Sequence, residues 1–173
     1  VREEVEAAWG DTDVLISGYD SSVGQVTEIP QSIVDDLREA NLNGIEGFQA
    51  GRVLSTAVVT SEGIANPSVP WFALEHRDDV RIGSENNGLT WFELEEINRF
   101  AETPQVVVNQ KFADELEVRS GDEIQFQWAV RNQNGIERIK ENFTIYQIVA
   151  MDGQGQLAGT TSPAVFTDLL SAQ

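Results

Sequence analysis

Cysteine is absent from this chain of 173 residues, so disulfide bonds and thiol chemistry are excluded. Histidine occurs once, at His76, and no G-x-S-x-G motif is present, so a serine hydrolase would depend on that one residue. We interpret His76, in the charged stretch EHRDD, as a solvated loop residue. No apolar run approaches the roughly 20 residues that a membrane-spanning helix needs. Because the chain begins at Val1 rather than Met, we expect a soluble domain excised from a longer protein.

Lysine is also scarce, with only Lys111 and Lys140, and acidic side chains dominate the charge. Asp and Glu number 29 and Lys and Arg number 11, which gives a formal net charge of −18. Nucleic acids and anionic membrane surfaces repel such a protein, so we expect no nucleic-acid partner. Salt relieves charge repulsion within a compact fold, and the composition therefore predicts a protein adapted to high salt, such as one from a halophile.

The many carboxylates do not define a catalytic or metal site. Adjacent pairs such as Asp35-Asp36, Asp78-Asp79 and Glu95-Glu96 do not face each other on a helix or strand. A glycosidase needs two carboxylates that converge from separate elements, and the sequence selects no such pair. The stretch GQGQLAG at 153–159 lacks the spacing of a phosphate-binding loop. We therefore expect no catalytic residue, no cofactor and no metal ion.

Hydrophobic periodicity predicts both strands and helices. A strand at 13–19, a helix at 30–41 that begins with Pro30, and strands within 45–60 indicate a βαβ or split βαβ unit. Later we expect strands at 69–76, 106–110, 122–130 and 142–151, a helix at 91–100, a helix capped by Asn109, a hairpin at Asn134-Gly135 and a final strand within 164–173. This order predicts an α+β fold.

Two aromatic pairs, Trp71-Phe72 and Trp91-Phe92, have two interpretations. The favoured one is packing in the hydrophobic core, because aromatic side chains bury a large apolar area. The alternative is an exposed contact surface, since aromatic residues anchor protein interfaces. All four residues are therefore candidate partner contacts.

The tripeptide Ser120-Gly121-Asp122 is either a chemical site or a turn. As a site it would use Ser120 as a nucleophile or Asp122 as a ligand, yet no strand-to-helix elbow surrounds the serine and no base lies nearby in sequence. As a turn, Gly121 supplies the backbone freedom and Asp122 bonds turn amides before the next strand. We favour the structural turn at Gly121 and Asp122.

The stretch VVVNQKFADELEVRSGDEIQF at 106–126, followed by a hairpin and by FTIYQIVAM at 143–151, resembles the extracytoplasmic core domain of MacB/FtsX-type ABC transporter permeases. That family has a strand, a helix like FADELEV, a Gly-Asp turn, a strand like FTIYQIV and a segment like VFTDLLSAQ. The opening stretches DTDVLISGYDSS and IPQSIVDDLREANLNGIEGFQA also fit its first strand-helix-strand unit. The segment 61–103 carries no part of the resemblance.

The resemblance implies a domain on the extracytoplasmic side of the cell membrane, between the first two membrane helices of a permease. It implies a βαβ-containing, membrane-proximal lobe at 1–75 and 160–173 with a smaller β-rich lobe inserted at 76–159, called Porter and Sabre. A separate ABC ATPase subunit hydrolyses ATP, and the domain relays that motion without being an enzyme. The implied partners are this ATPase subunit, a second permease copy, and an extracytoplasmic partner protein or substrate.

Two other functions are possible for the same residues. The chain is then a stand-alone exported domain that binds a ligand or a protein, or a carboxylate-dependent acidic hydrolase. Membrane segments in the complete gene and a neighbouring ATPase gene distinguish the permease from the stand-alone domain. Two convergent carboxylates with raised pKa values in a pocket would indicate the hydrolase.

Overall fold

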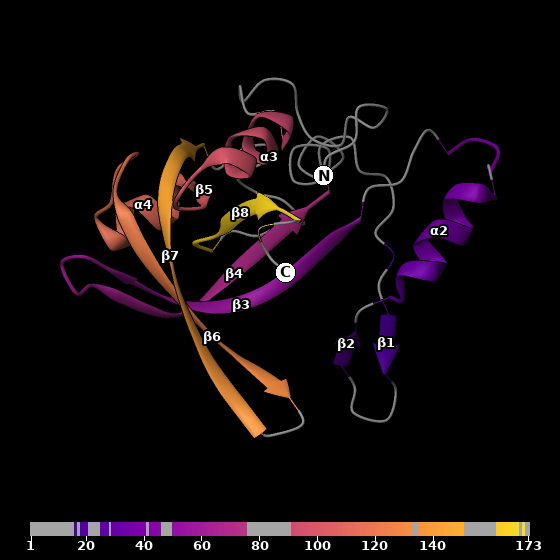
Figure 1. Cartoon of the computed structure of the whole chain (residues 1–173), viewed down its shortest axis with the longest axis horizontal. Helices are drawn as coiled ribbons and strands as arrows, with labels where there is room; N and C mark the ends of the chain where they lie inside the picture. The colour runs from indigo at the N-terminus through magenta and orange to yellow at the C-terminus, as the bar shows by residue number, and fades with distance from the viewer. Residues whose placement is uncertain are drawn as a thin grey trace, which may run out of the picture.

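The computed structural model describes residues 16, 18–20, 25–27, 29–40, 42–45, 50–75, 91–132, 135–150, 162–169 and 171. Its centre is a closed β-barrel whose strands follow the order β3-β4-β8-β5-β7-β6 (Figure 1). The strands are β3 (Gly51–Thr60), β4 (Ala65–Leu74), β5 (Gln105–Asn109), β6 (Glu123–Asn132), β7 (Gly135–Val149) and β8 (Val165–Asp168). The sheet is mixed, since β4 is parallel to β8 and β5 is parallel to β7, while the other neighbours are antiparallel.

Helices and a small second sheet complete the described part of the chain. The helices are α2 (Gln31–Glu39), α3 (Trp91–Phe100) and α4 (Gln110–Leu116), and the small sheet contains β1 (Gly18–Asp20) and β2 (Gln25–Thr27). In Figure 1, β1, β2 and α2 lie together to the right of the barrel. An ion pair between Arg38 of α2 and Glu75, the residue after β4, connects this group to the barrel.

The expected α+β fold, with a βαβ-containing lobe and an inserted smaller β-rich lobe, is wrong. β1 and β2 pair antiparallel with each other in a separate sheet, and β3 pairs antiparallel with β4 and β6. The predicted strand-helix-strand unit therefore does not form one parallel sheet. Periodicity locates a strand but does not identify its partner, and strand pairing over long sequence separations produces the barrel.

The barrel takes strands from both of the predicted segments. β3, β4 and β8 come from 1–75 and 160–173, and β5, β6 and β7 come from 76–159. The two groups of strands share one hydrophobic core.

Several local predictions are confirmed. Helix α3 has the predicted bounds. Asn109 caps α4, since its side chain accepts a hydrogen bond of 2.9 Å from the backbone N–H of Phe112. The hairpin of β6 and β7 is present, but its last pair joins Asn132 to Gly135, so Gly135 belongs to β7 rather than to the turn expected at Asn134-Gly135; residues 133–134 lie outside the described part. Local signals succeed here because caps and tight turns depend on neighbouring residues only.

Side chains on the inner face of the strands fill the barrel. The central cluster includes Trp71, Phe126 and Phe143, each at most 1% exposed. Their rings pack edge-to-face or stacked at centroid distances of 4.4 to 5.7 Å. Helix α4 adds three buried residues, Phe112, Ala113 and Leu116, to the same cluster. Each large buried side chain stabilises the fold by roughly 1.5–3 kcal/mol.

A second apolar cluster lies on the opposite face of the sheet, where α3 packs against β5 and β8. It contains Phe72, Leu94, Val107, Val149, Ala164 and Phe166. Leu94 of α3 is fully buried, and Phe72 stacks on Phe166 at a centroid distance of 5.6 Å. Of the helices in the described part of the chain, none combines the length and apolar character needed to cross a bilayer.

Candidate functional site

The segment Ser120-Gly121-Asp122 forms a turn between α4 and β6. Gly121 has a φ of +92°, and its N–H donates to the carbonyl of Ile145 at 2.7 Å. The Asp122 carboxylate accepts from the backbone N–H of Arg119 at 2.7 Å, while the N–H of Asp122 donates to the carbonyl of Arg119 at 3.1 Å. Gly121 and Asp122 therefore form the turn that the sequence predicts, with Gly121 in a left-handed conformation and Asp122 bonding a turn amide.

The aromatic pairs have different positions. Trp71 and Phe72 are 1% and 6% exposed, one inside the barrel and one beneath α3. The indole N–H of Trp71 donates to the hydroxyl of Thr167 at 3.0 Å, so its polar group is satisfied within the core. Core packing, the favoured interpretation, describes both residues. The side chains of Trp91 and Phe92 lie outside the described part.

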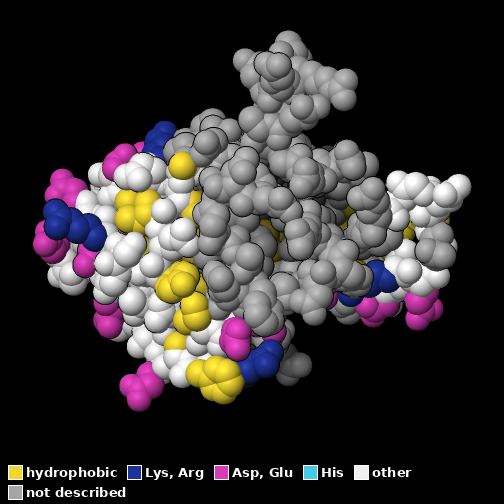
Figure 2. Space-filling view, turned by 90° about the horizontal axis from the view of Figure 1, so that it is seen from above, with side chains coloured by type: hydrophobic (Ala, Val, Ile, Leu, Met, Phe, Trp, Pro, Cys, Tyr) yellow, Lys and Arg dark blue, Asp and Glu magenta, His cyan; other side chains and the backbone are white. Residues whose placement is uncertain are grey.

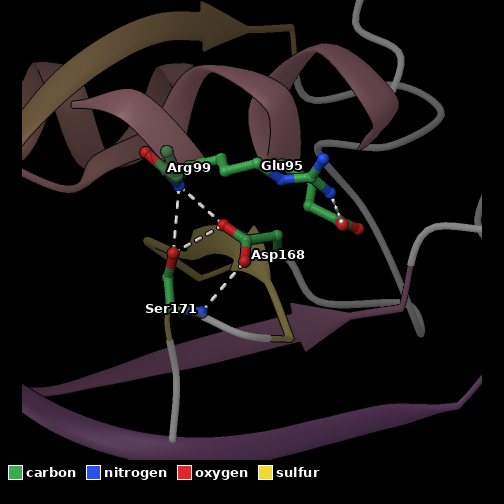
Figure 3. Close-up of polar contacts among 5 residues, drawn as sticks. Glu95, Arg99, Asp168 and Ser171 are labelled. Atoms are coloured by element: carbon green, nitrogen blue, oxygen red, sulfur yellow. Dashed lines mark hydrogen bonds and ion pairs between the residues drawn. The ribbon is translucent and has the colours of Figure 1, made fainter.

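A polar cluster joins α3 to the barrel beside β8 (Figure 3). The side-chain amide of Asn98 donates to the carboxylate of Asp168 at 2.6 Å and to the carbonyl of Gln105 at 3.0 Å. Its oxygen accepts from the N–H of Gln105 at 2.6 Å, which fixes the orientation of the amide. Asn98 thus bonds β5 and the end of β8 at once.

Asp168 is 1% exposed, and polar groups surround it. The hydroxyl and the backbone N–H of Ser171 donate to its two carboxylate oxygens at 2.6 and 2.9 Å. Glu95 and Arg99 line a hollow together with Asn98, Asp168 and Ser171, and they form an ion pair of 3.1 Å along α3. In Figure 3 the Ser171 hydroxyl donates to the Asp168 carboxylate and accepts from the side-chain amide of Asn98 at 3.1 Å. The cluster is a structural junction between helix and barrel.

Metal binding receives no support from the part of the chain that the structure describes. Its residues contain no group of three or more His, Cys, Asp or Glu side chains placed to hold an ion. His76, Asp78 and Asp79 and the glycine-rich stretch 153–159 lie outside the described residues.

The barrel closes between β3 and β6 along only part of these two strands. These strands pair from Thr60 with Ile124 to Ala57 with Gln127, and they do not pair beyond Ala57 and Gln127. β3 continues to Gly51 beside β4 alone, and β6 continues to Asn132 beside β7 alone. Figure 1 shows the two strands diverging beyond their paired ends. We call the segments Gly51–Ser55 and Trp128–Asn132 the barrel lip.

The inner face at the lip combines apolar side chains with two carboxylates of β7, Glu141 and Glu137, and Glu137 is engaged in another interaction. Leu54 and Trp128 are half-buried and pack against the central cluster, and Trp128 meets Trp71 edge-to-face at 5.4 Å. Glu141 of β7 pairs directly with Phe126 of β6, so both side chains lie on the inner face. Burial raises the pKa of Glu141 above its ordinary value of 4.5.

Apart from the barrel lip, an exposed apolar patch lies between α3 and β7. Phe100 is 80% exposed and Tyr146 is 39% exposed, and with Glu96 and Ile97 they line an open hollow of about 430 Å³. Figure 2 shows such hydrophobic side chains on the described surface, interspersed with carboxylates. Solvated carboxylates beside the patch are consistent with the acidic composition.

The sequence patterns did not predict roles for Asn98, Asp168 and Glu141. A signal existed for Glu141, because it precedes Phe143 and Ile145 in an alternating strand and so belongs to the apolar face. Asp168 precedes LLS in a pattern typical of a helix cap. Asn98 had no local signal, since its partners are distant in sequence.

No family model matches the chain, and no curated protein is significantly similar to it.

Proposed function

We propose that the chain is a non-catalytic binding domain, and specifically the extracytoplasmic domain of an ABC-type permease. The observation that carries this proposal is the order of the elements in the stretch that resembles MacB/FtsX-type permeases. That stretch forms β5, α4, the turn at Gly121, β6, β7 and β8 in the order of the resemblance. These four strands are neighbours, in the order β8-β5-β7-β6, so the stretch builds one contiguous part of the barrel.

A barrel is suited to relaying motion because its strands are connected in a ring. Helices α3 and α4 both pack on strands of this one barrel, so the elements share one framework. The ATPase subunit and a second permease copy act through the full-length protein, while the partner or substrate contacts the domain from outside the membrane.

Cysteine labelling tests the proposed location. Glu115 is exposed on α4, and the chain contributes no native thiol, so Glu115→Cys provides a single reporter. We expect a membrane-impermeant maleimide to label this variant of the full-length protein in intact cells. Labelling only after lysis contradicts an extracytoplasmic domain. The wild-type chain is the control for background labelling.

The complete gene tests the permease assignment separately. We expect about four membrane segments around this domain and a neighbouring ATPase gene. A complete protein without membrane helices would make the permease assignment wrong and leave the stand-alone binding domain, which the barrel lip favours.

A further inference from the structure

The barrel lip exposes two strand edges that face one another. On the described part of the chain, Gly51–Ser55 of β3 pairs only with β4, and Trp128–Asn132 of β6 pairs only with β7. The paired ends at Ala57 and Gln127 hold the two edges at one end, and the edges separate from there. Unpaired backbone groups along a strand edge readily accept another strand.

A strand between these edges fits the topology of the barrel. β3 and β6 are antiparallel, so an inserted strand is parallel to one and antiparallel to the other. The barrel already contains this arrangement, because β5 is parallel to β7 and antiparallel to β8.

The side chains at the lip specify an apolar face on the inserted strand. Leu54 and Trp128 are half-buried at the inner face, where the central core ends. Val53, on the outer face of β3, is 68% exposed. An extended segment would place one set of alternate residues over Leu54 and Trp128 and the other set over Val53, and its inward set must be apolar, because alternate residues of a strand point to opposite faces.

Charge complementarity gives the second requirement. Glu141 lies on the inner face, diagonal to Trp128, and its carboxylate forms no hydrogen bond or ion pair with another described residue. Arg52, on the same face of β3 as Leu54, is already engaged in another interaction. A partly buried carboxylate beside an aromatic ring favours a cationic side chain, and a net charge of −18 attracts cationic segments in general.

We propose that the barrel lip binds an extended segment of a partner protein, which enters as a strand between β3 and β6. The segment covers Leu54 and Trp128 with apolar side chains and places a lysine or arginine beside Glu141. This inference goes beyond the permease assignment and applies to the 173-residue chain whatever its host protein.

Synthetic peptides on the 173-residue chain test the proposal. The probe is a labelled peptide of about seven residues that alternates valine and threonine, with one arginine on the valine face at its centre. Its controls carry glutamine or glutamate instead of arginine. We expect the arginine peptide to bind most tightly, as measured by fluorescence anisotropy at fixed salt, and the glutamate peptide most weakly.

Backbone methylation distinguishes insertion from simple edge pairing. Alternate backbone amides of a strand point to opposite edges. A peptide methylated on its odd-numbered nitrogens therefore loses its N–H hydrogen bonds to one neighbouring strand, and a peptide methylated on its even-numbered nitrogens loses those to the other. Insertion between β3 and β6 predicts that both methylated peptides lose binding. If one of them binds like the parent peptide, only one edge is used and the proposal is overturned.

Matched variants test the charge. Glu141→Gln removes the partly buried carboxylate of β7 beside the lip, and Glu115→Gln removes an exposed carboxylate of α4 with the same change in net charge. We expect Glu141→Gln to weaken the arginine peptide roughly tenfold and to leave the glutamine peptide unchanged. Glu115→Gln should affect neither. Equal effects of the two variants would attribute binding to net charge and overturn the proposal.

Hydrogen exchange locates the bound peptide without any substitution. We expect the arginine peptide to protect amides in both 51–55 and 128–132. Protection near Phe100 and Tyr146 instead, or no binding to the folded chain, overturns the proposal. If the lip amides are protected from exchange without peptide and the chain sediments as a dimer, the lip is occupied by a second copy of the chain. These results are independent of the labelling experiment on the full-length protein.

Discussion

Gly121 is the residue at which backbone conformation matters most in the turn before β6. Its φ of +92° belongs to the left-handed region, and no atom lies within 4 Å of the position a Cβ would occupy. We expect Gly121→Val to destabilise the fold by about 2 kcal/mol, because a β-branched side chain strains this backbone although it meets no atom. Urea unfolding followed by circular dichroism measures the change.

Ser120 provides the neighbouring control. It is exposed beside Gly121, and the turn is held by backbone groups and by Asp122. We expect Ser120→Ala to change the free energy of unfolding by less than about 0.5 kcal/mol. Loss of an activity in Ser120→Ala at unchanged stability would contradict the turn interpretation and restore a chemical role for the serine.

Glu141 is expected to make the stability of the fold depend on pH. Burial raises its pKa above the ordinary value of 4.5, so the folded state binds its proton more tightly than the unfolded state. The fold therefore loses stability as the pH rises through the ordinary and then the folded pKa. We expect Glu141→Gln to be more stable than the wild type at pH 7, and the difference to vanish well below pH 4.5.

Urea unfolding across this pH range measures the difference. Glu115→Gln is the control, because its carboxylate is exposed and the change in net charge is equal. Wild type that is more stable than Glu141→Gln at pH 7 would show that the carboxylate has a favourable partner in the folded chain.

Helix α3 is the element whose attachment depends on both apolar and polar contacts. Leu94 is fully buried against β5 and β8, while Phe100, at the other end of the helix, is 80% exposed. We expect Leu94→Ala to lower the free energy of unfolding by roughly 3 kcal/mol, because it leaves a cavity in the second cluster. Phe100→Ala should lower it by less than about 0.5 kcal/mol, as thermal or urea unfolding would show. Equal effects would mean that α3 does not pack in this way.

The element scale also shows where sequence patterns were sufficient. The bounds of α3, the cap at Asn109 and the presence of a hairpin between β6 and β7 were predicted correctly, because each depends on residues close in sequence, although Gly135 lies in β7 and not in the turn. The junction of Asn98 with Asp168 was missed, because its partners are 70 residues apart and meet only when α3 packs on the barrel.

The whole molecule carries a net charge of −18, and this charge opposes the compact state. We expect Tm to rise by about 5 °C or more between low salt and molar potassium chloride, because ions screen the repulsion between carboxylates. Differential scanning calorimetry in a series of salt concentrations measures the change. Equal Tm values at low and molar salt would contradict the prediction that the protein is adapted to high salt.

The sequence by itself determined the composition of the surface, the positions of most strands and helices, and the local turns and caps. These properties depend on single residues or on neighbours along the chain. Only the tertiary structure decided that β3 pairs with β4 and β6 rather than with the N-terminal strands, and so that the fold is a barrel. It also decided that Trp71 lies inside that barrel and that Glu141 lies beside Phe126. Strand partners are selected by packing across the whole chain, and one sequence does not record that choice at any single position.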